Sequence, residues 1–455
     1  MARKPIGRLA GEGGGLRLLV EDGAWPRDMM ALFAFRMNNL PHIATVYGEE
    51  AARHARGVVC RILDKLVGDG GVVTPGAGTE RGDVITVLVW KTDLLGATAP
   101  EACCTRFAEE FSSAIAELPV RFGDNRLHIS VAGIWSLFGS ARFGYESSAS
   151  CRGVVAALSR ARFDGLPVGP GEGWARQYRA DMKMAAQLFE ALSADQLTLA
   201  WQPVCHAMND QAVLYHECLL RNDGAEDGAG PGEVVLALER LGLAGVLDRH
   251  VVSRVIEELA CEPDVCLGVN ISAQSACFDG WWRGVADRLR ERPDIAPRLI
   301  VEITETTSFP DIGQAAAFAA QMRKLGVRIA LDDFGVGHAS IRHLLALQPD
   351  IVKVDRFFMY RARESGRGRE ALRHLVGLAG NMASTVIVEG VETRADDELA
   401  SQVGAVWRQG FHKGSPSVIR AWRGGVSRQD ADGAGRFMYP ATVLREHFPC
   451  AGEGR

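Results

Sequence analysis

Seven acidic or amide side chains recur in or near the ends of short apolar stretches between residues 217 and 389. They are Glu217, Asn270, Glu302, Asp332, Asp333, Asp355 and Glu389. If these stretches lie side by side in one sheet, the side chains converge on a shared pocket, where six carboxylates would repel each other unless cations were bound. Oxygen atoms are the ligands that hard divalent cations prefer. The set is therefore a candidate site for Mg²⁺ or Mn²⁺.

The adjacent pair Asp332 and Asp333 can hold two cations, because one carboxylate can bridge both ions while its neighbour binds the second. Two ions about 3.5 to 4 Å apart clamp the attacking and leaving oxygens of a phosphoester displacement. Lys353 precedes Asp355 by two residues, so both point to the same side of a strand, and its ammonium can orient a water or neutralise developing charge. The planar guanidinium of Arg221 is suited to donate a pair of hydrogen bonds to a phosphate group.

Six apolar stretches of strand length position these side chains. They are residues 213–220, 265–272, 298–304, 328–334, 351–356 and 385–392, and amphipathic helical patterns lie between them. Such alternation predicts a parallel sheet with crossover helices. If the sheet closes into a (β/α)8 TIM-like barrel, the carboxyl ends of its strands form one rim, where side chains distant in sequence meet.

Composition restricts the class of protein. The 455 residues suffice for two or three domains, and 47% hydrophobic residues can fill ordinary cores. With a net charge of −5 and dispersed Lys and Arg residues, the sequence predicts no basic patch for binding duplex nucleic acid. No stretch reaches the roughly 20 apolar residues that a membrane span needs. The ten cysteines form no CxxC pair, which predicts reduced thiols and a cytoplasmic location.

A Pro- and Gly-rich stretch, LPVGPGEG, separates two units of different pattern. The smaller unit predicts an α+β sheet, with strands at 30–37, 84–90 and 126–135 and helices at 49–67 and 101–118. The expected organisation is a flexible arm (1–24), the α+β domain (25–164), a linker (165–177), the barrel (178–418) and an irregular tail (419–455).

From about residue 202 to 416 the chain resembles the EAL-type cyclic di-GMP phosphodiesterases. The segments that carry the resemblance are QPV at Gln202, HECLLR around Glu217, VNIS at Asn270, VEITE at Glu302 and Glu305, LDDFGVG at Asp332 and Asp333, VKVD at Lys353 and Asp355, VEGVE at Glu389 and Glu392, and QGFHKGSP at Gln409. Three departures are mild: Cys218 replaces Ala, Val336 replaces the usual Thr and His338 the usual Tyr.

The resemblance implies a role for each matching residue. A first metal would be bound by Glu217, Asn270, Glu302 and Asp332, and a second by Asp332, Asp333 and Asp355. Lys353 would contact the catalytic water, with Glu389 and Gln409 supporting the water and metal shell. Glu305 would hold the loop that follows the two aspartates. The expected substrate contacts are Gln202 and Arg221.

The resemblance further implies that the substrate is cyclic di-GMP, that the product is linear 5′-pGpG, and that two ions of Mg²⁺ or Mn²⁺ are needed. The alternative is a catalytically silent receptor that binds the dinucleotide and signals through a protein partner. Such a receptor usually lacks several metal ligands, and every position of the set is present here. A third interpretation is a scaffold that acts through protein contacts alone. A homodimer through the barrel remains open.

The region from about residue 30 to 165 resembles a GGDEF, or diguanylate cyclase, domain that has lost its chemistry. Tyr47 to Glu49 stand where that family has Tyr-Gly-His, and Arg81 to Ile85 stand where its signature lies. Arg36 occupies the first metal-aspartate position and Val84 that of the signature Glu. The resemblance therefore implies an inactive cyclase, which is either an allosteric or docking domain, with a possible protein partner, or a structural remnant.

Overall fold

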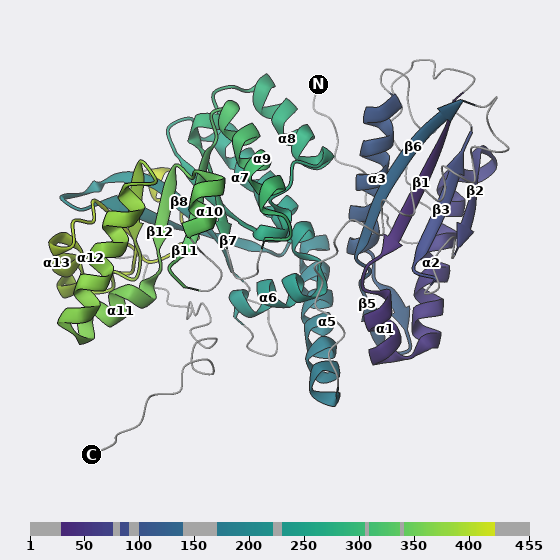
Figure 1. Cartoon of the computed structure of the whole chain (residues 1–455), viewed down its shortest axis with the longest axis horizontal. Coiled ribbons are helices and arrows are strands. Elements are labelled where there is room, and N and C mark those ends of the chain that lie inside the picture. Colours follow the sequence, from purple (N-terminus) through teal and green to yellow (C-terminus); the bar gives the residue numbers. More distant parts are fainter. Residues whose placement is uncertain are drawn as a thin grey trace. The chain divides into compact units, whose positions relative to one another are not determined.

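The computed structural model describes residues 29–75, 82–90, 100–139, 171–221, 230–304, 309–336 and 341–423. The chain divides into two compact units. The first holds the residues up to 186 with 240–246 and 279–284, and the second holds 187–239, 247–278 and the residues from 285 onward. Figure 1 labels the elements of both units. The expected boundaries of the arm, linker and tail stay predictions.

The first unit contains a four-stranded antiparallel sheet in the order β2-β3-β1-β6. Its strands are β1 (Met29–Met37), β2 (Gly71–Pro75), β3 (Val84–Val89) and β6 (Val131–Gly139), and β4 (Val120–Phe122) and β5 (Asn125–Leu127) form a separate hairpin. Its helices are α1 (Leu40–Tyr47), α2 (Glu49–Val67) and α3 (Pro100–Glu117). The predicted α+β class is confirmed.

Strand alternation places the core of this sheet. Phe33 and Phe35 are two residues apart on β1, so both rings lie on one face. That face packs against α3, with ring centroids 4.8 Å apart for Phe33 and Phe107 and 4.6 Å apart for Phe35 and Phe111. The apolar face of α3 thereby buries one side of the sheet.

The continuous strand predicted at 126–135 is wrong, because the structure breaks it into β5 and β6. Between them, the Asn39 side chain takes the place of a neighbouring strand. Its Nδ2 donates to the carbonyl of His128 at 2.9 Å, and its Oδ1 accepts from the amide of Ser130 at 3.0 Å. The backbone groups of this bend are thus satisfied without a ladder partner.

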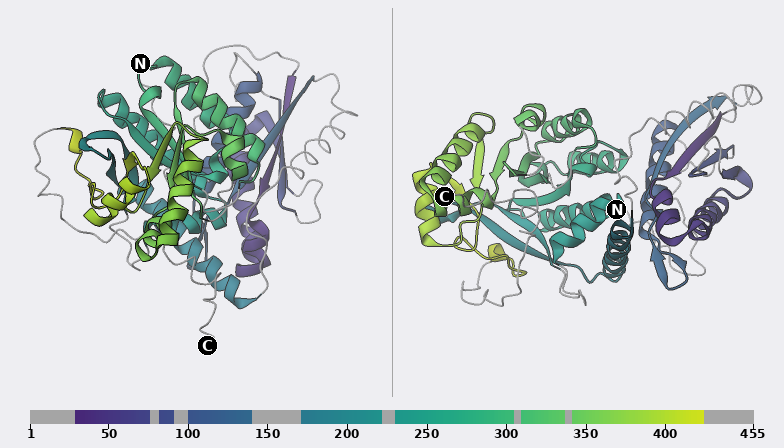
Figure 2. Two further views of the ribbon diagram at one scale, coloured as in Figure 1. Left: turned by 60° about the vertical axis from the view of Figure 1, so that its left-hand side comes forward. Right: turned by 60° about the horizontal axis from the view of Figure 1, so that its bottom comes forward.

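The second unit is built on a closed eight-stranded barrel in the order β10-β11-β12-β13-β14-β7-β8-β9, which confirms the TIM-like fold. The strands are β7 (Thr198–His206), β8 (Asn209–Arg221), β9 (Leu267–Ser272), β10 (Leu299–Thr304), β11 (Arg328–Phe334), β12 (Ile351–Val354), β13 (Thr385–Val388) and β14 (Trp407–Arg408). The remaining α-helices of the described residues are α5 (Glu172–Ser193), α6 (Pro231–Leu241), α7 (Ala244–Cys261), α8 (Gly280–Glu291), α9 (Ile312–Lys324), α10 (Ile341–Leu347), α11 (Arg356–Glu364), α12 (Gly366–Gly380) and α13 (Arg394–Gln402). Figure 2 shows helices on the outside of the strands. No helix in the described ranges is both long and apolar enough to cross a membrane.

The barrel is not wholly parallel, which corrects the expectation of a parallel sheet. β7 runs antiparallel to both of its neighbours, β8 and β14. Only Ala207 and Met208 separate β7 from β8, and a connection this short can join strands only as a hairpin. The sequence did not predict β14, because two residues are too few to show the alternation of a strand.

Two layers of side chains fill the barrel, and their order follows from strand alternation. The lower layer is apolar and buried, and consists of Val204, Tyr215, Ile300, Ala330, Ile351 and Ile387. On the parallel strands, the residue two positions further along is polar: Glu217, Glu302, Asp332, Lys353 and Glu389. On the antiparallel β7 the polar partner is two positions earlier, at Gln202. The polar set therefore forms one layer directly above the apolar floor.

The described part of the expected tail packs on the barrel. Residues Ala421–Arg423 form a 3₁₀ turn, and the ring of Trp422 lies 5.4 Å from that of Trp201 and 4.8 Å from that of His216. Arg420 adds an ion pair to Glu258 on α7. Arg420 and Trp422 thus contact residues of the barrel unit.

Acidification should destabilise the first unit through His128. Burial lowers the pKa of His128 from 6.5 to about 4, and its Nδ1–H donates to the carbonyl of Ala116 at 2.8 Å. The folded pKa lies below the unfolded one, so this contribution is complete above about pH 6.5 and is lost as the pH falls toward 4. We expect wild type to lose about 2–3 kcal/mol more unfolding free energy over that range than His128→Gln.

Urea unfolding at a series of pH values measures this difference. The control is His54→Gln, because His54 is exposed on α2 and should leave the pH dependence unchanged. Parallel pH profiles for His128→Gln and wild type would contradict the assignment.

Candidate metal centre

Lys353 lies at the centre of the polar layer, with only 1% of its surface exposed. Its Nζ is 2.9 Å from Glu302 Oε2, 2.9 Å from Glu389 Oε1, 3.0 Å from Glu217 Oε2 and 3.2 Å from Asp332 Oδ1. These carboxylates come from β8, β10, β11 and the end of β13, so a single ammonium joins four parts of the barrel.

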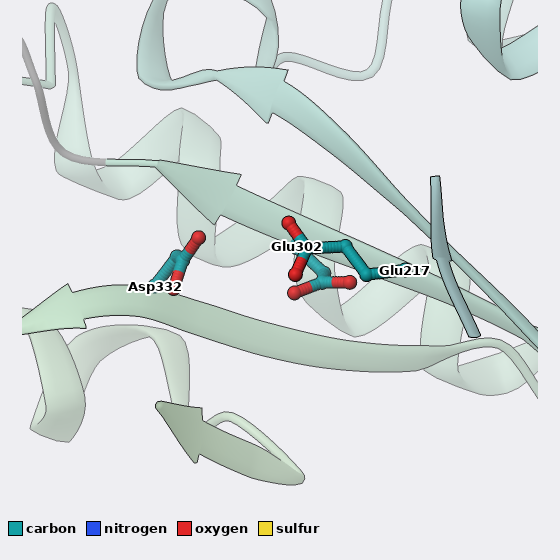
Figure 3. Close-up of side chains that lie close together, drawn as sticks. All are labelled: Glu217, Glu302 and Asp332. Carbon is teal, nitrogen blue, oxygen red and sulfur yellow. The ribbon is translucent and has the colours of Figure 1, made fainter. Parts of the chain in front are cut away.

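The acids form two groups that share Asp332. In the first, oxygens of Glu217, Glu302 and Asp332 all lie within 4.8 Å of one another, and Figure 3 shows these three side chains close together. In the second, Asp332, Asp333 and Glu389 meet the same limit. A carboxylate common to two acidic groups can bridge two adjacent cations.

A local irregularity of β11 allows both aspartates to serve this site. In a regular strand, Asp332 and Asp333 would point to opposite faces. The pairing of β11 with β12 shifts register between Leu331 and Phe334, and Asp333 has a positive φ of 53°. This bulge turns Asp333 toward the side that Asp332 occupies.

The residues present fit divalent cations, as the hydrogen bonds around Glu217 show. Asn270 Nδ2 donates to Glu217 Oε1 at 2.6 Å, and Gln409 Nε2 donates to Glu217 Oε2 at 2.5 Å. Both amides thus use their nitrogen within the cluster. Among the described residues, three buried oxygens of this cluster have no hydrogen-bond partner: Asn270 Oδ1, Gln409 Oε1 and Glu302 Oε1. Buried oxygens without partners are costly, and a cation would satisfy them.

The pKa values show how strongly the acids oppose one another. Burial raises the pKa of Glu217, but the Lys353 ammonium and the bonds from Gln409 and Asn270 outweigh it, so the net shift is downward. For three others, burial and then neighbouring carboxylates raise the pKa: Glu302, Asp332 and Asp333. Burial also raises the pKa of Glu389 to about 8. One ammonium therefore leaves an excess of acid that added cations would balance.

The other predicted site residues lie around this centre. Asp355 caps α11, with Oδ1 accepting from the amide of Phe357 at 2.7 Å, and its charge helps to raise the pKa of Asp333. Gln202 is buried, with Nε2 donating to the carbonyl of Gly414 at 3.0 Å and Oε1 accepting from Gln409 at 3.4 Å. Arg221 ends β8 and is half-buried.

Glu305 and His338 fall outside the described residues. Val336 lies inside them, where its amide donates to the carbonyl of Asp333 at 3.2 Å. Tyr215 was not predicted, although its hydroxyl donates to Glu302 Oε2 at 3.2 Å. Its signal in the sequence is its position two residues before Glu217, which puts both side chains on the inner face of β8.

Comparison with known proteins identifies the family. The family model of the EAL domain matches residues 185–416, which is just over half of the chain. The chain therefore belongs to the EAL domain family. The resemblance found from residue 202 to 416 is confirmed. The GGDEF-like character of the first unit stays a prediction.

Two curated relatives cover the same region. The chain is 28% identical over 241 residues to the bifunctional diguanylate cyclase/cyclic di-GMP phosphodiesterase MucR of Pseudomonas aeruginosa, spanning 52% of this chain and 35% of MucR. It is 27% identical over 249 residues to the cyclic di-GMP phosphodiesterase PdeF of Escherichia coli, spanning 54% of this chain and 33% of PdeF. The chain thus spans about a third of the length of these relatives.

Among solved structures, the PaMucR phosphodiesterase in complex with c-di-GMP covers 53% of this chain and 99% of its own, with 27% identity and a TM-score of 0.47.

Removal of the central ammonium should destabilise the barrel. Lys353→Met leaves four carboxylates, three of them buried, without their cation, which should lower the unfolding free energy by about 3–5 kcal/mol in the presence of a chelator. Excess Mg²⁺ should restore part of this loss, because it supplies positive charge to the same oxygens.

Urea unfolding with EDTA and with MgCl₂ measures both effects. The control is Lys324→Met, because Lys324 is exposed at the end of α9. If Lys353→Met were as stable as this control, Lys353 would not hold the carboxylates together.

Proposed function

We propose that this chain is a metal-dependent phosphodiesterase that hydrolyses cyclic di-GMP to linear 5′-pGpG. The observation that carries the proposal is the pair of acidic groups that share Asp332 around the buried Lys353. The partnerless oxygens beside them fit cations rather than a purely structural network. Membership of the EAL family and the names of MucR and PdeF support the choice of substrate.

Two ions of Mg²⁺ or Mn²⁺ would be held by the oxygen set. One would take Glu217, Asn270, Glu302 and Asp332, and the other Asp332, Asp333 and Asp355. When bound, such ions lower the pKa of a water molecule and neutralise charge on the attacking and departing oxygens of a phosphoester.

The protein's own residues prepare this reaction. Lys353 is held by four carboxylates, so its ammonium has a fixed position from which to orient a water and balance negative charge. Asn270 and Gln409 each donate to one oxygen of Glu217 and thereby fix the plane of its carboxylate. Gln202 accepts a hydrogen bond from Gln409, and Arg221 would hold a substrate phosphate. Glu305 would hold the loop after Asp333.

A catalytically silent receptor is the less favoured function, because no described position of the ligand set has lost its oxygen. A cytoplasmic location and a homodimer through the barrel stay predictions.

We also propose that the first unit makes no cyclic di-GMP. Arg36 stands on β1 with Nε donating to Asn38 Oδ1 at 3.0 Å, and Asp83 lies near its charge. Val84 is buried, with 1% of its surface exposed. A cation on the phosphates of GTP needs carboxylates, and neither Arg36 nor Val84 supplies one. A regulatory role, with a protein partner, fits this unit better than synthesis.

Glu217→Ala should lower hydrolysis of cyclic di-GMP by more than about 100-fold and weaken binding of Mn²⁺, because it removes an oxygen ligand and the anchor of two amides. Chromatography of the products after incubation with Mg²⁺ or Mn²⁺ measures the rate. Glu291→Ala, at the exposed end of α8, is the control and should retain wild-type activity. Near wild-type turnover by Glu217→Ala would remove the proposed metal site.

The full chain should form no cyclic di-GMP from GTP and Mg²⁺. The Glu217→Ala variant is the right protein for this measurement, because any product that the first unit made would not be consumed by the barrel. Mass spectrometry of the reaction after long incubation provides the readout. Accumulation of cyclic di-GMP would show that the first unit is a working cyclase.

A further inference from the structure

Tyr215 brings a hydroxyl into the apolar floor of the barrel, directly beneath the candidate metal centre. It is 1% exposed and belongs to the buried layer formed with Val204, Ile300 and three other aliphatic residues. A phenol buried so deeply needs a hydrogen-bond partner, and an aliphatic side chain would have filled the layer without that requirement. The partner it has is one of the candidate metal ligands.

The hydroxyl of Tyr215 fixes one particular oxygen of Glu302. It donates to Oε2 at 3.2 Å, and the same oxygen lies 2.9 Å from the Nζ of Lys353. Two donors therefore hold Oε2 from below and from the side. The other oxygen, Oε1, is buried and has no hydrogen-bond partner. Without the hydroxyl, a single contact would remain to decide which oxygen of this carboxylate turns toward the centre.

The strand between Tyr215 and Glu302 is shaped to admit this contact. β9 lies between β8 and β10 and carries Gly268 opposite Glu217 and Ile300. A Cβ at Gly268 would lie 2.1 Å from Glu302 Oε1 and 2.6 Å from the ring of Tyr215. Only glycine leaves room there for both the phenol and the carboxylate.

We propose that Tyr215 is a positioning residue, which orients Glu302 so that Oε1 is presented to a divalent cation. The inference rests on the proposed function, in which Glu302 is a metal ligand. The hydrogen bond from Tyr215 acts as an outer contact that fixes the rotation of a ligating carboxylate, as such contacts do in metal sites generally.

Tyr215→Phe tests the role of the hydroxyl while keeping the ring that fills the floor. Titration calorimetry of the full chain with MnCl₂, after removal of metal by a chelator and without substrate, should give about 10-fold weaker binding than wild type. Hydrolysis of cyclic di-GMP should return close to the wild-type rate at saturating Mn²⁺, because the change affects loading of the metal. Damage to the barrel itself would not be reversed in this way.

The matched control is Tyr360→Phe. Tyr360 also donates its hydroxyl to a glutamate, Glu392, at 2.8 Å, but outside the cluster around Lys353. This variant should bind Mn²⁺ like wild type. Gly268→Ala is a second variant, and it should weaken Mn²⁺ binding because its Cβ would displace Glu302 Oε1.

The outcomes separate this inference from the proposed function. If Tyr215→Phe, or Gly268→Ala should the former not fold, binds Mn²⁺ as tightly as wild type while wild type hydrolyses cyclic di-GMP, the positioning role is wrong and the function stands. If wild type binds Mn²⁺ but hydrolyses nothing, the function fails, and the ratio of Mn²⁺ affinities still decides the role of Tyr215. If wild type binds no Mn²⁺, both are wrong.

Discussion

Lys353 places one buried positive charge within 3.2 Å of four carboxylates, and the order of the barrel's upper layer depends on it. Taking a charge out of water is costly, and the cost is offset only where partners are close and well oriented. Here the partners come from strands that are distant in sequence, so the ion pairs form only when the barrel has closed. The same contacts leave more acid than one ammonium can balance, and this excess is the physical basis of the proposed binding of cations.

The layered filling of the barrel explains why such a cluster can exist inside a stable fold. Below the polar layer, the aliphatic floor supplies the hydrophobic burial that stabilises the closed sheet. The floor also excludes water from the underside of the carboxylates, which strengthens every electrostatic interaction above it. Tyr215 connects the two layers by a hydrogen bond, because its ring packs in the floor and its hydroxyl donates to Glu302 in the polar layer.

The two units illustrate how much a fold leaves undecided about function. In the barrel, the inward positions at the rim carry carboxylate and amide side chains around the ammonium of Lys353. In the first unit, Arg36 and Val84 pair across two antiparallel strands, and the predicted resemblance to a cyclase would place metal-binding carboxylates at these two positions. The sheet is retained by its phenylalanine core, which does not depend on those two residues. Folding and chemistry are therefore separable in that unit.

Much of the barrel could be predicted from the amino-acid sequence, because alternation along a strand is a local property. The apolar residues of β11 predicted its bounds from Arg328 to Phe334, and acidic or amide residues in or near the ends of successive apolar stretches predicted that these side chains share one site. Tertiary structure alone decided the rest. The bulge that turns Asp333 beside Asp332 depends on pairing with β12, and β14 is recognisable only by its neighbours in the barrel. Which oxygen of Glu302 is held by donors depends on Tyr215 and Lys353, which approach it from other strands. These features depend on distances between residues far apart in the chain, which no local pattern of residue types specifies.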